Sequence, residues 1–180
     1  MLRFQNDYSE GAHPNVLRAL CDTNLCSTPG YGLDDDCRRA ADAIRACFAC
    51  PDADVHFLVG GTQTNQLAAA AFLRPWEAMV AADTGHINVH ETGAIEATGH
   101  KVLALPGRNG KLKGDQIREV VKAHREDGSH EHMVQPGMVY ISNPRRSARS
   151  IIRRAWRIST MPARSAASIS ILTVRAWATA

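Results

Sequence analysis

The sequence contains no hydrophobic run that approaches the roughly 20 residues needed to span a membrane. Its first residues, 1–7, also lack the long apolar stretch of a secretory signal peptide. We therefore expect a cytoplasmic protein that makes no use of a membrane. With 180 residues, of which 44% are hydrophobic, the chain can form a globular domain with a core of its own.

Cysteines are few, odd in number and unevenly placed, because all five lie within the first 50 residues. An odd, clustered set argues against a disulfide scaffold. Cys47 and Cys50 form a lone CxxC, and no second pair follows to complete a zinc site. We predict reduced, partly buried thiols and no metal site.

The tail that follows Asn143 has no aspartate, glutamate or lysine, yet it contains eight arginines. All 18 acidic residues therefore lie in residues 1–143, together with 13 of the 21 basic ones. Arginines without acids are typical of an arm that binds nucleic-acid phosphates. Trp156 and Trp177 are the only aromatic residues among these arginines, and no recognised nucleic-acid motif is present. We therefore predict no nucleic-acid partner.

The residue pattern predicts alternating helices and strands. Apolar residues at spacings of three and four indicate helices, and short apolar runs bounded by turns indicate strands. Such alternation is typical of an α/β fold with a largely parallel sheet. We expect helices over 14–21, 34–50, 62–73, 86–98 and 114–127, and strands over 55–59, 78–82, 101–105 and 138–142.

A glycine turn, Gly60-Gly61-Thr62, follows the predicted strand 55–59 and opens the next predicted helix. Free amides at a helix start, aided by the helix dipole, can hold a phosphate group. The Thr62 hydroxyl is expected either to contact that phosphate or to cap the helix. A purely structural turn capped by threonine remains the alternative.

Histidines follow about one strand–helix unit later. His86 and His90 share a face if the segment is helical, which would suit zinc, but the pattern is not HExxH. His130-Glu131-His132 lies in a predicted polar loop and is expected to be solvated. An imidazole beside a planar phosphorylated cofactor fits the upstream phosphate turn better. A histidine at the surface or the core edge remains the alternative.

Six motifs in residues 4–144 together resemble the low-specificity threonine aldolases, within the aromatic amino-acid β-eliminating lyase and threonine aldolase family. The motifs are NDYSEGAHP, PGYGLDD, FLVGGTQTN, GHINVHETGAIEATGHKV, NGKL and VYISNP. This resemblance implies the aspartate-aminotransferase-like fold (fold type I), here with an incomplete large domain, and pyridoxal 5'-phosphate as cofactor.

The resemblance also implies roles for individual residues. Gly61 and Thr62 would hold the cofactor phosphate, and His86 would stack on the pyridine ring and help to move protons. Asn6 stands where the family places a small polar residue, usually serine, near the substrate carboxylate. Tyr31 matches a residue that reaches the active site of the neighbouring subunit, in a family that forms dimers or tetramers.

Beyond Pro144 the resemblance stops. The family continues with TEIGTIY, later DGAR, whose aspartate and arginine contact the pyridine nitrogen and the substrate carboxylate, and later still the Schiff-base lysine. The lysines of this chain, at 101, 111, 113 and 122, match none of these positions. We therefore expect this chain to be inactive.

The genetic code offers an explanation for the tail. When the third base of each codon is joined to the first two of the next, residues 144–151 permit TEIGTIY and residues 172–179 permit DGARLGY. We hypothesise a one-base frameshift near Asn143–Pro144. It divides the chain into an aldolase-like part, 1–144, and a poorly ordered tail, 145–180.

The expected function is a pyridoxal-phosphate-dependent lyase that cleaves a β-hydroxy-α-amino acid into glycine and an aldehyde. One alternative is a lyase of the same family that eliminates at Cβ. Another is a non-catalytic fragment that pairs with intact subunits through residues 1–40.

Overall fold

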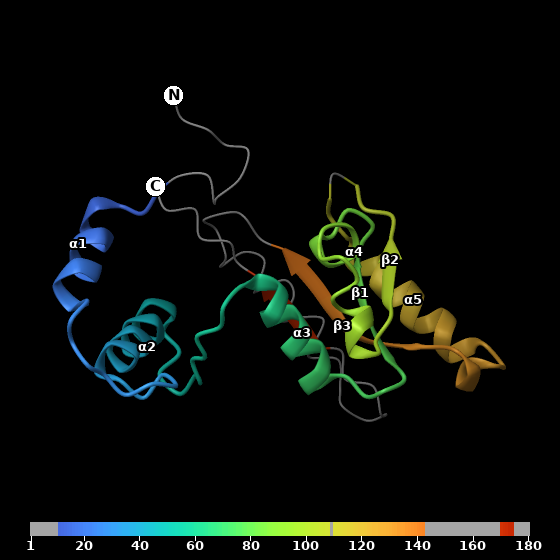
Figure 1. Ribbon diagram of the computed structural model, residues 1–180. Helices are drawn as coiled ribbons and strands as arrows, with labels where there is room; N and C mark the ends of the chain where they lie inside the picture. Colours follow the sequence, from blue (N-terminus) through green and yellow to red (C-terminus); the bar gives the residue numbers. More distant parts are fainter. Residues whose placement is uncertain (1–10, 109, 143–169, 175–180) are drawn as a thin grey trace. The chain divides into compact units, whose positions relative to one another are not determined.

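The structure, a computed structural model, describes residues 11–108, 110–142 and 170–174 (Figure 1). The chain divides into two compact units, Met1–Val59 with Thr179–Ala180, and Gly60–Ala178. The tail predicted over 145–180 therefore falls mostly outside the described residues. In the part of the chain that the structure describes, no helix is long and apolar enough to cross a membrane.

The first unit contains two helices, α1 (Pro14–Thr23) and α2 (Asp35–Phe48), close to where the sequence predicts them. Pro14 begins α1, where its missing amide proton costs nothing. Neither helix is well covered: α1 buries no residue, and α2 buries only Ala41. The described part of this unit thus has almost no apolar core of its own.

The cysteines of this unit are all free thiols, but the expectation that they are partly buried is wrong for four of them. Only Cys37 is half-buried, while Cys21, Cys26, Cys47 and Cys50 are exposed. The reason is the same lack of covering layers over α1 and α2.

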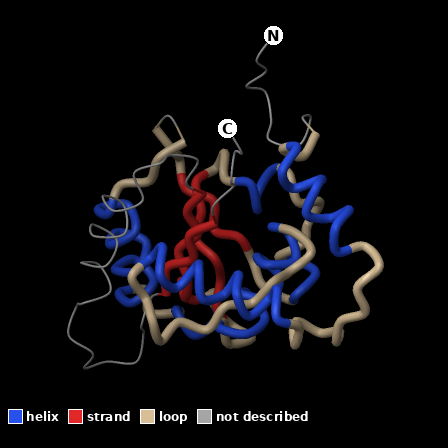
Figure 2. The backbone as a smooth tube through the Cα atoms, turned by 90° about the vertical axis from the view of Figure 1, so that its left-hand side faces the viewer, coloured by secondary structure: helices blue, strands red, loops and turns tan. Residues whose placement is uncertain are grey.

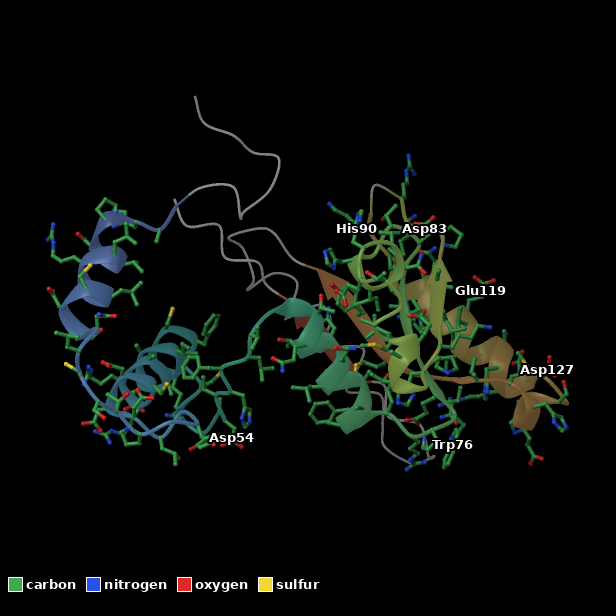
Figure 3. All side chains as sticks on the ribbon, in the orientation of Figure 1. Asp54, Trp76, Asp83, His90, Glu119 and Asp127 are labelled. Atoms are coloured by element: carbon green, nitrogen blue, oxygen red, sulfur yellow. The ribbon has the colours of Figure 1, made fainter. Side chains whose placement is uncertain are left out.

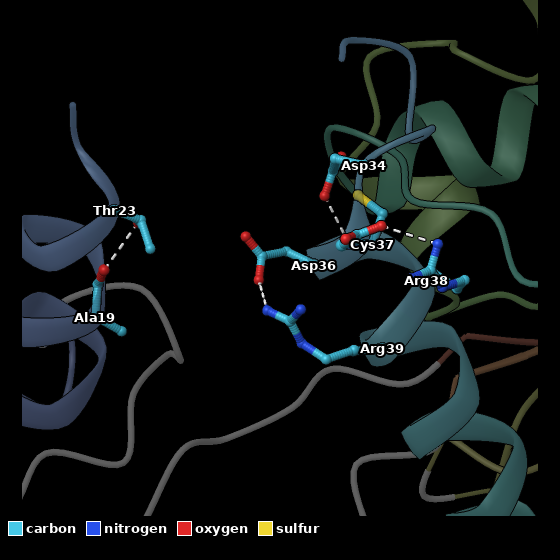
Figure 4. A network of polar contacts seen from close by, with 8 residues as sticks. Ala19, Thr23, Asp34, Asp36, Cys37, Arg38 and Arg39 are labelled. Carbon is cyan, nitrogen blue, oxygen red and sulfur yellow. Dashed lines mark hydrogen bonds and ion pairs between the residues drawn. The ribbon is translucent and has the colours of Figure 1, made fainter. Parts of the chain in front are cut away.

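Asp34 caps α2 by accepting a hydrogen bond from the Cys37 amide at 2.8 Å, as drawn in Figure 4. This bond holds the pKa of the Asp34 carboxyl below its usual value, since it stabilises the ionised form. The same carboxylate raises the pKa of the Cys37 thiol. Exposed pairs of Asp35 with Arg38 and of Asp36 with Arg39 follow along the first turns.

The cap makes α2 sensitive to acid. The stabilisation by Asp34 is complete above the ordinary aspartate pKa and is lost as the pH falls through its lowered pKa. We expect Asp34→Ala to reduce the helicity of α2 at neutral pH, and Asp34→Asn to retain it, because asparagine also caps helices. Carbon-13 chemical shifts of α2, followed against pH, should show a smaller acid-induced loss in Asp34→Asn than in the native chain. An identical loss in both would assign the effect to Asp35 and Asp36 instead.

The predicted strand over Val55–Val59 is not formed; the structure shows a loop there. Phe57 and Leu58 are exposed in it, although a central strand of a parallel sheet would be buried on both faces. A segment with strand propensity forms a strand only when a neighbouring strand pairs with it and another layer covers it. In the structure, residues 55–59 pair with no described strand, and Phe57 and Leu58 stay exposed.

The second unit is built on one sheet of four parallel strands in the order β2-β1-β3-β4. Figure 2 shows the strands in red, with helices in blue around them. The strands are β1 (Glu77–Ala82), β2 (Val102–Leu105), β3 (Gln135–Ser142) and β4 (Ser170–Val174). The predicted α/β fold with a parallel sheet is thereby confirmed. β4 was not predicted; its five residues form a strand in a tail that we expected to be poorly ordered, and the remainder of that expectation stays untested.

Helices cover both faces of this sheet. Successive residues of β1 alternate between two core clusters: Met79 packs with residues of α3 (Gly61–Phe72), and Val80 packs with Ile117 of α5 (Gly114–Glu126). Figure 1 accordingly shows α3 and α5 on opposite sides of the sheet. Because both faces are covered, five of the six β1 residues are buried.

The helix predicted over 86–98 is broken into two short pieces. α4 covers only His86–Val89, and a 3₁₀ turn, η1, covers Glu96–Thr98. Between them Thr92 and Gly93 have positive φ angles of 55° and 74°, which a right-handed helix does not allow. A second 3₁₀ turn, η2 (His130–His132), lies in the predicted polar loop.

Candidate active site

The glycine turn opens α3, as the sequence predicts. Gly60 is extended, no side chain caps the helix, and the first backbone bond runs from the Thr64 amide to the Gly60 carbonyl at 3.1 Å. Space is open around both glycines, since a Cβ built at Gly60 or Gly61 would meet nothing within 4 Å. The threonine cap of the alternative interpretation is therefore absent, while the role of the turn stays a prediction.

His86 stands just beyond the carboxyl end of β1, at the start of α4. A tight turn places it there: the Gly85 amide donates to the Ala82 carbonyl at 2.8 Å, and a Cβ at Gly85 would lie 2.9 Å from that carbonyl oxygen. Asp83 holds the same turn, because its carboxylate accepts hydrogen bonds from the Thr84 and Gly107 amides. Figure 3 shows Asp83 at this end of the sheet.

A buried polar chain joins α3 to His86. The Asn65 side chain, four residues beyond Gly61, donates from Nδ2 to Glu91 Oε1 at 2.6 Å. His86 Nδ1 lies 2.7 Å from the same oxygen. The Glu91 side chain is completely buried, while that of His86 is 53% exposed. The helix that the predicted phosphate turn opens is therefore hydrogen-bonded, through Asn65 and Glu91, to the predicted cofactor histidine.

The same two elements meet at a second point, where Gln66 Nε2 donates to the Ala94 carbonyl at 3.2 Å. Two buried atoms of the assembly, Asn65 Oδ1 and Glu91 Oε2, have no hydrogen-bond partner among the described residues. Buried polar atoms without partners are uncommon and often mark functional sites. The uncapped helix start fits a phosphate group, and the exposed His86 imidazole fits a planar ligand.

The other two predicted site residues, Tyr31 and Asn6, belong to the first unit of the chain. Tyr31 belongs to the first unit, where it is fully exposed and has a φ of 64°, an unfavourable backbone conformation for a bulky residue. Asn6 lies outside the described residues. The His86 and His90 rings are 5.5 Å apart, but the described part of the chain contains no group of three residues placed to hold a metal ion.

Sequence reasoning missed the two residues that connect the site, Asn65 and Glu91. Both stand inside quoted motifs, GGTQTN and HETGA, but nothing in their spacing pairs a helix residue with one 26 positions later. The available signal was an acidic residue five positions after the histidine. It did not predict the contact between the two side chains, because the segment was expected to be a continuous helix.

Comparison with known proteins identifies the family of this chain. The sequence profile of the family described as Beta-eliminating lyase matches residues 15–148, which is most of the chain. The chain belongs to this family. The match ends within a few residues of Pro144, where the resemblance in the sequence also stops.

Relatives within the beta-eliminating lyase family include two low specificity L-threonine aldolases. That of Pseudomonas aeruginosa is 32% identical over 120 residues, covering 66% of this chain and 34% of its own length. That of a Pseudomonas species is 30% identical over 142 residues, covering 78% of this chain and 40% of its own length. The chain thus spans well under half the length of these relatives.

A solved structure, a threonine aldolase of Leishmania major, superposes with a TM-score of 0.72 at 51% identity, covering 77% of this chain and 39% of the other. A likeness this close confirms the fold predicted from the sequence, as part of a larger domain. The helix start and the histidine described above therefore belong to a chain with the fold of a threonine aldolase.

Proposed function

We propose that residues 60–101 form one part of a pyridoxal 5'-phosphate site, in a lyase that cleaves β-hydroxy-α-amino acids to glycine and an aldehyde. The observation that supports this most is the Asn65–Glu91–His86 chain, because it ties an open helix start to an exposed imidazole. Gly61 and Thr62 would hold the phosphate through the first turn of α3, where the helix dipole favours an anion.

When bound, the cofactor would supply the electron sink for breaking the bond between Cα and Cβ. The chain's own residues would orient the ligand and handle protons. His86 would lie against the pyridine ring, with its exposed nitrogen placed to accept or return a proton. Asn6 would lie near the substrate carboxylate.

Tyr31 would serve the active site of a neighbouring subunit in a homo-oligomer. Its side chain is fully exposed, and its backbone adopts a costly conformation with a positive φ angle. Costly backbone conformations persist where the surroundings or the function require them, so both features fit a side chain that reaches outward to a partner.

The tail, 145–180, would then be a frameshift product, and the chain as written would not catalyse. None of its lysines stands where the family has the Schiff-base lysine, and no other nucleophile replaces it. Restoring the reading frame near codon 143 should return TEIGTIY, DGAR and that lysine, and with them activity.

The products of the frame-restored protein test this function against the alternative. Aldol cleavage of L-threonine yields glycine and acetaldehyde, whereas β-elimination yields a 2-oxo acid and ammonium. We expect equal amounts of glycine and aldehyde from the frame-restored protein supplied with pyridoxal 5'-phosphate, and neither from the 180-residue chain. Formation of a 2-oxo acid and ammonium instead would favour the eliminating lyase, and activity of the 180-residue chain would contradict the proposal.

A further inference from the structure

The most unusual group in the described residues is the Glu91 carboxylate. Its side chain is fully buried, yet no lysine or arginine pairs with it among the described residues. A buried carboxylate needs hydrogen-bond donors, because removing the charge from water is costly. Two groups contact its Oε1 oxygen: Asn65 Nδ2, which donates at 2.6 Å, and the His86 ring nitrogen Nδ1, at 2.7 Å.

We propose that Glu91, held in place by Asn65, is a positioning residue that fixes His86 with its proton on Nδ1 and its lone pair on Nε2. Only the use of Nε2 as a proton acceptor in catalysis rests on the proposed function. The proton position itself follows from the contact.

The contact decides the tautomer because a carboxylate oxygen can only accept. Asn65 must present its amide NH₂ to Glu91 Oε1, since its own oxygen would be repelled. His86 must likewise present Nδ1–H, because the other neutral tautomer would bring a nitrogen lone pair against the carboxylate at 2.7 Å. A hydrogen bond to a charged acceptor favours the donating tautomer by about 10-fold or more.

The consequence is a defined acceptor at the exposed side of the ring. The His86 side chain is 53% exposed, whereas Glu91 and Asn65 are buried. The Nδ1 atom therefore faces the buried Glu91 carboxylate. Nε2 remains available to ligands with its lone pair, as a proton acceptor. A free histidine in water favours the opposite tautomer, so the protein has to impose this one, and the buried pair provides the means.

Nitrogen-15 NMR of the 180-residue chain, labelled at histidine, measures the proton position without cofactor or substrate. The His86 signals are assigned by their disappearance in His86→Gln, and spectra are recorded at alkaline pH, where the imidazoles are neutral. We expect His86 to show a protonated Nδ1 and an unprotonated Nε2. A protonated Nε2 in the native chain would overturn the proposal.

Two variants separate the contact from general structure. Glu91→Leu removes the acceptor and should shift His86 toward the Nε2–H tautomer by about 10-fold or more. Glu96→Leu removes an acidic residue of the same segment that forms no ion pair with His86 among the described residues, and it should leave the tautomer unchanged. An unchanged tautomer in folded Glu91→Leu would also overturn the proposal.

If Glu91→Leu fails to fold, the native spectrum alone decides. Failure of the proposed function can be distinguished from failure of this proposal. If the frame-restored protein is inactive, the measured tautomer of His86 still stands. Conversely, an active enzyme with the proton on Nε2 would refute only the role of Glu91.

Discussion

Replacing Gly137 with valine is expected to lower the free energy of unfolding by roughly 3 kcal/mol, as overpacking of a buried strand does. A Cβ at Gly137 would lie 2.8 Å from the Glu77 Cβ and 2.9 Å from the Leu73 Cδ2. Glu77 Cβ is fixed by its own backbone and cannot move away alone. β1 and β3 would have to separate, and they are the central pair of the sheet.

Gly137 also marks an irregularity in the pairing of these strands. Ala78 pairs with Pro136 and Met79 with Met138, so Gly137 is the extra residue of a β-bulge. The bulge bends β3 where it pairs with the first half of β1, the strand that leads to His86. A misplaced strand should therefore disturb the site as well as the core.

Urea unfolding of the second unit, followed by a fluorescence or circular dichroism signal, measures the Gly137→Val effect. Gly128→Val is the matched control, because a Cβ at Gly128 meets nothing within 4 Å, and we expect a change of about 0.5 kcal/mol or less. Equal stability of the two variants would show that the close approach of β1 and β3 is not as described.

The largest functional effect is expected at His86, in the frame-restored protein. His86→Phe keeps a flat ring that can stack but removes proton transfer, so kcat should fall by about 10²-fold or more while cofactor affinity is retained. His86→Ala removes both contributions and should weaken cofactor binding as well. His90→Phe is the matched control, since that ring lies 5.5 Å from the His86 ring and, among the described residues, forms no hydrogen bond with the Glu91 side chain; it should retain activity.

Cofactor titration and steady-state kinetics with L-threonine distinguish these contributions. If His86→Phe kept the native kcat, His86 would contribute only stacking, and another group would carry the proton. If His90→Phe lost as much activity as His86→Phe, the buried chain through Glu91 would not be what distinguishes the two histidines.

Much of the second unit could be predicted because each element carries its own local signal. The apolar runs of β1, β2 and β3 and the amphipathic pattern of α5 are visible within a few residues. The open start of α3 follows from Gly60-Gly61 in the same way. Local patterns therefore predicted the parallel sheet and the position of the glycine turn beside it.

The failures depend on what lies far away in the sequence. Residues 55–59 have strand composition, but a strand forms only with a neighbour and a covering layer. The 86–98 segment has helical spacing, but Thr92 and Gly93 break it and turn Glu91 inward to Asn65. Contacts between residues 26 positions apart leave no periodicity to detect, so the sequence predicted the histidine and missed the pair that holds it.

We propose that residues 1–144 are the first part of a threonine-aldolase-type lyase whose remaining site residues are encoded in a shifted frame. The nucleotide sequence from codon 140 through the end of the tail decides this. We predict that the shifted frame reads TEIGTIY from codon 144 and DGARLGY from codon 172, and continues to a lysine in the family's position. A shifted frame that lacks these motifs or meets an early stop codon would contradict the account.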